Sequence, residues 1–222
     1  VERTRRQCLG EPLSAITADF CRRLGIGCAV LPMSDDAVRT RVLTADGWLD
    51  FQDYFVRRRC GPSVREIAFA GAPDARAHPA FLAALGSERL RAVVICPSNP
   101  FISIGPILGL PAVRPALAAC EAPIVAVSPI IGGRAVKGPT AKMMTELGLD
   151  VSAPAVARQY GDLLDGYIVD HADAGADFGA ELHVTPARTL MVTLADREAL
   201  ARVTLEAADA IARGGVRRRT TA

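Results

Sequence analysis

Residues 92–100 read Ala-Val-Val-Ile-Cys-Pro-Ser-Asn-Pro, and residues 124–129 read Ile-Val-Ala-Val-Ser-Pro. Each stretch is a short, continuous apolar run that ends in a polar turn, which is typical of a strand covered on both faces. Helical patterns follow over Val113–Cys120 and over about Thr140–Leu147. Two consecutive units of this kind predict parallel strands joined by right-handed crossovers. The predicted fold class is therefore α/β, a Rossmann-like three-layer parallel or mixed sheet with helices on both faces.

The flanking sequence predicts further elements of the same fold. Ser14 is a candidate cap for a helix that runs to Leu24, where Gly25 ends it. A closing amphipathic helix is predicted over Arg197–Ala212. The remaining predictions are a strand over Cys28–Met33, a hairpin of Val38–Thr44 and Trp48–Phe51, strands over Val64–Phe69, Tyr167–Asp170 and Thr189–Thr193, and a short helix over Pro79–Leu85.

Composition narrows the class of protein. The chain has 222 residues, of which 50% are hydrophobic, so it can bury a sizeable core and is predicted to form one domain over residues 1–222. A net charge of +2 does not indicate a nucleic-acid partner, and the arginine runs 57–59 and 217–219 are interpreted as solvated. No apolar stretch is long enough to cross a membrane. The six cysteines are scattered without a C-x-x-C pair, which favours a reduced, cytoplasmic protein with mostly buried thiols.

Two loops follow the quoted apolar runs. In an open parallel sheet the ligand crevice lies beyond the carboxyl ends of the strands, at a switch point, so we expect these loops to face each other there. The first loop offers the hydroxyl and amide side chains of Ser98, Asn99 and Ser103. The second offers a hydroxyl, glycines that let a backbone approach an anion, and two ammonium groups, at Ser128, Gly132, Gly133, Lys137, Gly138 and Lys142.

The two lysines strengthen the prediction of an anion site. The chain has 26 lysine and arginine residues, and only Lys137 and Lys142 are lysines. Lysine is a compact point charge with three donors, which suits a phosphate oxygen. The loops therefore favour a site for a phosphate or diphosphate, although Ser-Asn-Pro, Ser-Pro and Gly-Gly are also ordinary turn sequences. Residues 132–138 lack the G-x-x-x-x-G-K-[ST] pattern, so a P-loop ATPase has no support.

Acidic and aromatic residues are more ambiguous. Asp35 and Asp36 follow a predicted strand and are candidate magnesium ligands, but either of them could cap the next segment or be solvated. Asp170 and Asp173, with His171 between them, are interpreted as a surface turn. Core packing is the expected role of most of the aromatic residues Trp48, Phe51, Tyr54 and Phe101.

Four segments carry a family resemblance. Residues 97–108 and 127–143 contain the two long loop motifs, and residues 31–36 and 50–56 add shorter ones. Together they resemble the CofD/FbiA family of 2-phospho-L-lactate transferases, which act in the biosynthesis of the deazaflavin coenzyme F-420. The resemblance implies a Rossmann-like core, a possible homodimer and a magnesium-dependent reaction. In that reaction the ribityl hydroxyl of the deazaflavin Fo attacks a GDP-linked phospholactate, or its enolpyruvyl analogue, and releases GMP.

The resemblance also implies roles for the candidate residues. Ser98, Asn99 and Ser103 are expected to hold the nucleotide diphosphate. The transferred and leaving phosphates are expected to contact the second loop, at Ser128, Gly132, Gly133, Lys137, Gly138 and Lys142. Phosphoryl transfer needs mainly positioning and stabilisation of charge on oxygens, which hydroxyl and ammonium groups can supply.

Family members resemble this chain only after an additional opening segment. That segment is expected to carry a glycine-rich strand–loop, acidic residues that contact the metal and the deazaflavin, and the general base, all upstream of Val1. We therefore expect the first strand of the sheet to be absent from these 222 residues, and the chain alone to have little or no transferase activity. The alternatives are a non-catalytic regulatory protein of the same superfamily that binds a nucleotide or nucleotide sugar, and an inactive fragment.

Overall fold

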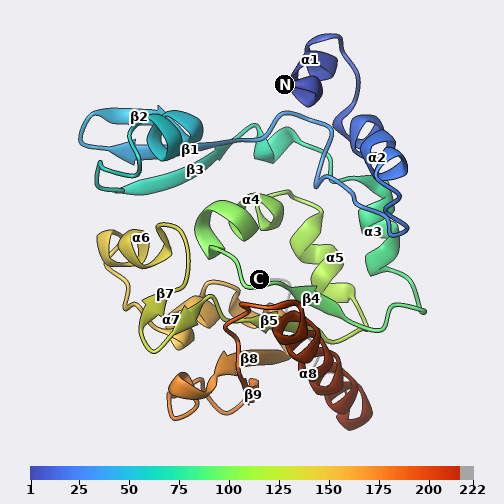
Figure 1. Ribbon diagram of the computed structural model, residues 1–222, viewed down its shortest axis with the longest axis vertical. Coiled ribbons are helices and arrows are strands. Elements are labelled where there is room, and N and C mark those ends of the chain that lie inside the picture. Colours follow the sequence, from blue (N-terminus) through green and yellow to red (C-terminus); the bar gives the residue numbers. More distant parts are fainter. Residues whose placement is uncertain (216–222) are drawn as a thin grey trace.

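The centre of the protein is a four-stranded parallel sheet. The computed structural model describes residues 1–215. Strand order is β4-β5-β8-β9 (Figure 1), and all three neighbouring pairs are parallel. The strands are β4 (Val93–Ile95), β5 (Ile124–Val127), β8 (Gly166–Asp170) and β9 (His183–Ala187). The two apolar runs quoted at the outset are therefore neighbouring parallel strands, which confirms the predicted fold class.

Helices cover both faces of this sheet, which makes three layers. Side chains alternate along β5, so Ile124 and Ala126 pack on one face while Val125 and Val127 pack on the other. The first face is covered by α3 (Pro79–Leu85), α5 (Val113–Ala119) and α7 (Ala153–Arg158), and the second by α8 (Leu194–Gly214). Burial on both faces is why β5 is a continuous apolar run rather than an alternating one, whereas Val94 in β4 is 39% exposed, so the prediction that both runs are covered on both faces holds for β5 only.

A separate antiparallel sheet lies at one end of the molecule, beside α6 (Thr140–Glu146) (Figure 1). Its order is β2-β1-β3, and β1 pairs with β2 as the predicted hairpin. The strands are β1 (Arg39–Thr44), β2 (Gly47–Asp50) and β3 (Glu66–Ala70), and the π-helix η1 (Asp53–Arg57) follows β2. The sheet joins α6 through one buried group, which we call the Tyr54 cluster, formed by Val42, Leu49, Tyr54, Val64 and Met143.

Short elements complete the described chain. Two of them, β6 (Ile130–Ile131) and β7 (Arg134–Ala135), form a small hairpin directly after β5. The others are α1 (Glu2–Cys8), α2 (Leu13–Arg23), η2 (Ala72–Asp74), η3 (Pro100–Ile104), α4 (Gly105–Leu108), η4 (Gly161–Leu163) and η5 (His171–Asp173).

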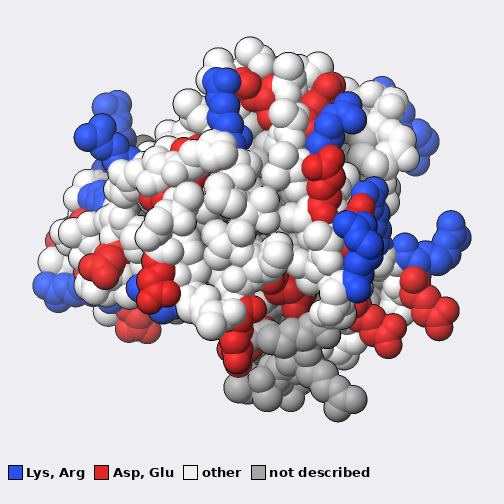
Figure 2. Space-filling view, turned by 90° about the horizontal axis from the view of Figure 1, so that it is seen from below, with Lys and Arg blue, Asp and Glu red and all other residues white. Residues whose placement is uncertain are grey.

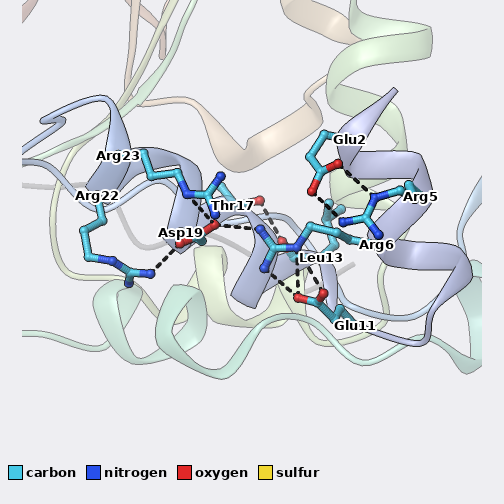
Figure 3. Close-up of polar contacts among 9 residues, drawn as sticks. All are labelled: Glu2, Arg5, Arg6, Glu11, Leu13, Thr17, Asp19, Arg22 and Arg23. Carbon is cyan, nitrogen blue, oxygen red and sulfur yellow. Dashed lines mark hydrogen bonds and ion pairs between the residues drawn. The ribbon is translucent and has the colours of Figure 1, made fainter.

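Charge, rather than apolar packing, attaches α1 to α2. Helix α1 has no buried residue. The Arg6 guanidinium instead pairs with Glu11 at 2.6 Å and with Asp19 at 2.7 Å (Figure 3), and it lies 5.9 Å above the Phe20 ring. Only 13% of the Arg6 side chain is exposed, so this pair network is largely shielded from solvent.

Two predicted strands are wrong. Residues 28–33 form no strand, since no neighbouring segment pairs with them. Residues 189–193 also form a loop, and the strand lies earlier, at β9. The polar and proline residues of β9, including His183 and Pro186, hide it from an apolar pattern. Proline is tolerated there because β9 is an edge strand of the described sheet.

Three further sequence predictions need correction or restriction. Helix α2 begins after Pro12, and its proposed cap, Ser14, donates its hydroxyl to Asp35 instead. Only Cys120 of the six cysteines is buried, so the prediction of mostly buried thiols is wrong. Arg58 pairs with Asp46 and Asp53, whereas the arginine run 217–219 lies outside the described residues.

Charged side chains of both signs are interspersed on the face shown in Figure 2. Within residues 1–215 no single helix is both long enough and apolar enough to span a membrane. The bent pair Pro100–Leu108 and Val113–Ala119 meets the test only by length and composition.

Candidate functional site

A cavity of about 780 Å³ opens at the carboxyl ends of the parallel strands. The segments that follow β4, β5 and β9 line it, together with the start of α6 and two phenylalanines next to β2. This is where open parallel sheets bind ligands. The described strands follow one another in chain order, so the cavity lies at the strand ends but not at a reversal of strand order within residues 1–215.

The structure brings both predicted loops onto this cavity. Six of the nine candidate substrate-binding residues line it, namely Ser98, Asn99, Ser103, Ser128, Lys137 and Gly138. The expectation that the two strand-end loops face each other across a crevice is therefore confirmed as a matter of geometry.

Three of these residues offer groups that are available to a ligand. The hydroxyls of Ser98 and Ser103 have no hydrogen-bond partner within the described residues, and the exposed Lys137 makes no ion pair there. Gly138 follows with φ +70°, so a residue with little steric cost in that conformation stands beside the ammonium group. Two hydroxyls and one cation thus remain to meet an anion.

Asn99 and Ser128 instead shape the loops. The Asn99 side-chain oxygen accepts hydrogen bonds from the backbone N–H groups of Phe101 (2.9 Å) and Ile102 (3.1 Å), and so caps η3. The buried Ser128 hydroxyl donates to the carbonyl of Ile130 and accepts from its N–H, both at 3.1 Å. These side chains hold each loop in the form that presents its neighbours.

Gly132 and Gly133 do not line the cavity. They form the two-residue turn between β6 and β7, with φ values of +54° and +72°. Positive φ at both central residues is the requirement of a type I′ hairpin turn, which glycine meets without strain. The Gly132 N–H donates to Asp173 at 2.9 Å. The prediction that this pair faces the crevice is therefore wrong, because the glycines are needed for the turn.

Lys142 also lies away from the cavity lining. Its ammonium group pairs with Glu146, donates to the Pro62 carbonyl at 3.0 Å and lies 5.9 Å from the centre of the Tyr54 ring. A cation in the first turn of a helix is unfavourable without an anion, and Glu146 supplies that anion from within the protein. The expectation that both lysines face one crevice is wrong for Lys142.

The environment of Glu146 fits this pairing. Burial raises the pKa of its carboxyl group, but hydrogen bonds from Lys142 and the Val64 N–H outweigh burial, so the pKa lies below its ordinary value.

The candidate magnesium ligands are engaged elsewhere. Asp35 accepts hydrogen bonds from the backbone and hydroxyl of Ser14, and Asp36 accepts from the Arg76 N–H. Neither lines the cavity, and no other carboxylate among residues 1–215 does. Within residues 1–215 no group of three or more His, Cys, Asp or Glu side chains is placed to hold a metal. Hydroxyl and amide groups alone do not match the carboxylate ligands that Mg²⁺ takes in proteins, so this donor set does not fit it.

The acidic cluster after β8 has a role that the sequence did not reveal. Asp170 accepts hydrogen bonds from the Thr189 N–H (3.0 Å) and hydroxyl (3.1 Å), and thereby holds the loop 189–192 against the cavity. Burial raises the pKa of Asp170, but the hydrogen bonds from Thr189 and Ala172 lower it below its ordinary value. Asp170 and Asp173 thus position two neighbouring loops. The sequence signal that could have indicated this role is the position of both residues at the carboxyl end of a buried strand.

Part of the cavity lining is apolar. The rings of Phe51 and Phe55 stack with centroids 5.2 Å apart, and we call this pair the aromatic wall. Aliphatic side chains that also line the cavity are those of Ile102, Ile131, Val136, Leu190, Met191 and Val192. Tyr54 is fully buried as expected for core packing, whereas Phe51 both packs on the Tyr54 cluster and lines the cavity. The cavity therefore suits a ligand with an anionic end and a flat apolar end.

Comparisons with known proteins agree with this geometry. The protein-family model described as 2-phospho-L-lactate transferase CofD matches residues 4–205. The chain is 39% identical over 219 residues to a phosphoenolpyruvate transferase of Streptomyces griseus, covering 95% of this chain and 68% of that protein. It is 38% identical over 202 residues to a 2-phospho-L-lactate transferase of Methanosarcina mazei, covering 89% and 65% respectively.

A solved structure shares the fold. It is a Bacillus halodurans protein of the upf0052 family, with a TM-score of 0.59 over 87% of this chain and 67% of that one, at 12% identity. The chain spans about two thirds of the length of the curated relatives it matches. Since the family model covers most of the described chain, this protein belongs to the 2-phospho-L-lactate transferase CofD family.

Proposed function

We propose that this chain carries the substrate site of a transferase of coenzyme F-420 biosynthesis. The enzyme moves a 2-phospho-L-lactate or enolpyruvyl phosphate unit from a GDP-linked donor to the deazaflavin Fo and releases GMP. The observation that supports this most is the amphipathic cavity, which is lined by Lys137 and two available hydroxyls as well as by the aromatic wall. The names of two relatives, phosphoenolpyruvate transferase and 2-phospho-L-lactate transferase, agree with it.

The polar side of the cavity binds the donor in this proposal. The hydroxyls of Ser98 and Ser103 donate to diphosphate oxygens, and Lys137 places its charge on the phosphate that is transferred or on the one that leaves. Asn99, Ser128 and Gly138 fix the loops that carry these groups. In the reaction the ribityl hydroxyl oxygen forms a bond to the transferred phosphorus while the bond from that phosphorus to the GMP oxygen breaks.

The apolar side binds the acceptor. A deazaflavin ring is flat and largely apolar, so it can stack on the aromatic wall and exclude water from it. This places the two substrates on opposite sides of one cavity, with the reacting oxygen and phosphorus between them. The hydroxyl proton must pass to a base, and because no carboxylate lines the cavity we assign that role to none of the described residues.

Several expectations stay predictions. The magnesium ion implied by the family resemblance needs carboxylates, and none of residues 1–215 that line the cavity offers one. The single domain over residues 1–222, the homodimer and the cytoplasmic location rest on the sequence and the resemblance alone.

One observation favours a second candidate function. A cavity with a cation and hydroxyls but no carboxylate can bind a nucleotide diphosphate without catalysing transfer. The alternative is therefore a regulatory protein that binds a nucleotide or nucleotide sugar.

Two measurements separate the candidates. Calorimetry should give tighter binding of GDP than of UDP, together with binding of Fo, if the transferase proposal is correct. Incorporation of label from a GDP-linked lactyl donor into Fo would in addition contradict the expectation that the chain alone has little or no transferase activity. A preference for uridine nucleotides, with no affinity for Fo, would favour the regulatory alternative.

A further inference from the structure

Lys142 and Glu146 bridge two parts of the fold that are far apart in the sequence. Lys142 donates to the Pro62 carbonyl at 3.0 Å, and the second carboxylate oxygen of Glu146 accepts from the Val64 N–H, also at 3.0 Å. Residues 62–64 connect η1 to β3, so both hydrogen bonds attach α6 to the antiparallel sheet. Figure 1 shows α6 next to this sheet.

The Lys142–Glu146 pair contributes little to the stability of α6 itself. A lysine four residues before a glutamate is the less favourable order along a helix, and the lysine stands in the first turn, where a cation opposes the helix dipole. Helix α6 is also only 7 residues long. The placement is therefore explained by the bonds that the two side chains make to Pro62 and Val64, outside the helix.

This bridge contacts the element that carries the aromatic wall. Tyr54, between Phe51 and Phe55 in the sequence, is fully buried beneath the Lys142 ammonium group. Val64 and Met143 pack in the same Tyr54 cluster. The element that carries the two phenylalanines is thus held on α6 by the cluster and, at its polar rim, by the Lys142–Glu146 pair.

Helix α6 also contacts the polar side of the cavity. The Met143 sulfur lies 3.5 Å from the Asn99 amide nitrogen, and Thr140 lines the cavity. However, Ser98 follows β4, Ser103 lies in η3 and Lys137 lies between β7 and α6. None of these three donor groups makes a bond to residues 62–64. A loosened bridge should therefore displace the aromatic wall while the anion-binding groups keep their places.

We infer that Lys142 and Glu146 are positioning residues that set the aromatic wall relative to the strand-end loops. They govern the affinity of the cavity for its flat apolar ligand and leave the affinity for the anion nearly unchanged. For the identity of the two ligands, Fo and GDP, this inference rests on the proposed function.

Glu146→Gln separates this role from the anion-binding role that the sequence suggested for Lys142. The variant keeps an acceptor for the Val64 N–H but removes the negative charge beside Lys142. If Lys142 bound the anion, releasing it from Glu146 should strengthen GDP binding. If the pair positions the wall, the variant should weaken Fo binding and leave GDP binding alone.

The experiment is calorimetric titration of the purified chain with GDP and, separately, with Fo. We expect Lys142→Met and Glu146→Gln each to weaken Fo binding about tenfold and to change GDP binding by less than about twofold. The double variant should lose no more than either single variant, because both act through one bridge. Lys142→Arg should keep most of the Fo affinity, since a guanidinium can still donate to both the Pro62 carbonyl and the Glu146 carboxylate. Cooperative urea unfolding of each variant shows that it is folded.

Three results would overturn the inference: tighter GDP binding by Glu146→Gln, equal losses of both ligands, or no change in Fo binding in either single variant. If the unsubstituted chain bound neither GDP nor Fo, both the proposed function and this inference would be refuted. Binding of both ligands with the wrong variant pattern would sink the inference alone.

Discussion

Lys137 and Lys142 lie five positions apart in one segment, yet the fold places them in opposite surroundings. Lys137 is exposed on the cavity and has no ion pair within the described residues, whereas Lys142 is partly buried and bonded to Glu146 and Pro62. Both lysines lie near the start of α6, where a positive charge is favourable only beside an anion. The difference is whether the protein supplies that anion itself. The lysine whose charge is left unmatched is the one that can bind a ligand.

The glycines of the same segment divide in the same way. Gly132 and Gly133 have positive φ because a hairpin turn requires it, and the Gly132 N–H is already bonded to Asp173. Gly138 has positive φ beside Lys137 on the cavity. Backbone N–H groups can bind an anion only where the fold leaves them unpaired, so positive φ alone does not mark an anion site.

The largest effect is expected when the unmatched lysine is removed. Lys137→Met should weaken GDP binding about ten- to hundredfold, because a charge-assisted hydrogen bond to phosphate contributes about 1.5–3 kcal/mol. Its unfolding free energy should change by less than about 0.5 kcal/mol, since the side chain is exposed. Calorimetry at one fixed salt concentration measures the first quantity and urea unfolding the second.

Arg134→Met is the matched control for this prediction. Arg134 is an exposed cation three positions before Lys137, but it does not line the cavity. Its loss should leave GDP affinity nearly unchanged. A loss as large as that of Lys137→Met would mean that the general positive field of the hairpin, and not a contact of Lys137, attracts the nucleotide.

The next prediction tests whether the glycines between β6 and β7 serve the turn or the ligand. Gly133→Ala should lower the unfolding free energy by about 1–2 kcal/mol, because alanine is strained at positive φ. No atom is close enough to clash with the added methyl group, since the nearest is the Val151 carbonyl oxygen at 3.5 Å. GDP affinity should stay the same in this variant. A drop in GDP affinity without loss of stability would support the anion-binding role that the sequence predicted for Gly132 and Gly133.

The parallel core was predictable because its strands have an unusual requirement. Strand β5 is buried on both faces, which needs a continuous apolar run, whereas Val94 on one face of the apolar strand β4 is 39% exposed. The polar turns after both strands mark their carboxyl ends. Placing Ser98 and Lys137 on one cavity followed from this topology alone. The edge strand β9 was missed because an edge position tolerates the proline and histidine that interrupt its pattern.

The partners of individual side chains were less predictable. Glu146 stands four positions after Lys142, so the sequence contains the pair. Nothing in one sequence tells whether the lysine prefers that carboxylate or a ligand, because the choice depends on Pro62 and Val64 arriving from elsewhere in the chain. The same holds for Asp170, whose partner Thr189 is brought close by the pairing of β8 with β9.

A smaller effect should appear in the pH dependence of stability. The pKa of Glu146 lies below its ordinary value of 4.5 in the folded chain, so its contribution to stability is complete above pH 4.5 and is lost as the pH falls through the folded-state pKa. Glu146→Gln should therefore lower the unfolding free energy by about 1 kcal/mol at neutral pH and by less in acid. Urea titrations from pH 7 down to about 3 measure this difference. A difference that stays constant over that range would mean that the charge of Glu146 does not stabilise the fold.

The smallest effect, close to zero, is expected when divalent metal is withdrawn from the binding reaction. Lys137 and the hydroxyls of Ser98 and Ser103 are polar groups on the cavity without a partner in the described part of the chain, and no carboxylate of residues 1–215 lines the cavity to share a metal with the phosphates. GDP binding to the chain should therefore change by less than about twofold between buffer with Mg²⁺ and buffer with EDTA, measured by calorimetry at matched ionic strength. Lys137→Met under both conditions is the control, because its loss of affinity should also be independent of metal. A strong dependence on Mg²⁺ would show that carboxylates outside the cavity lining reach the nucleotide. The ammonium group of Lys137 would then be the lesser part of the charge that holds it.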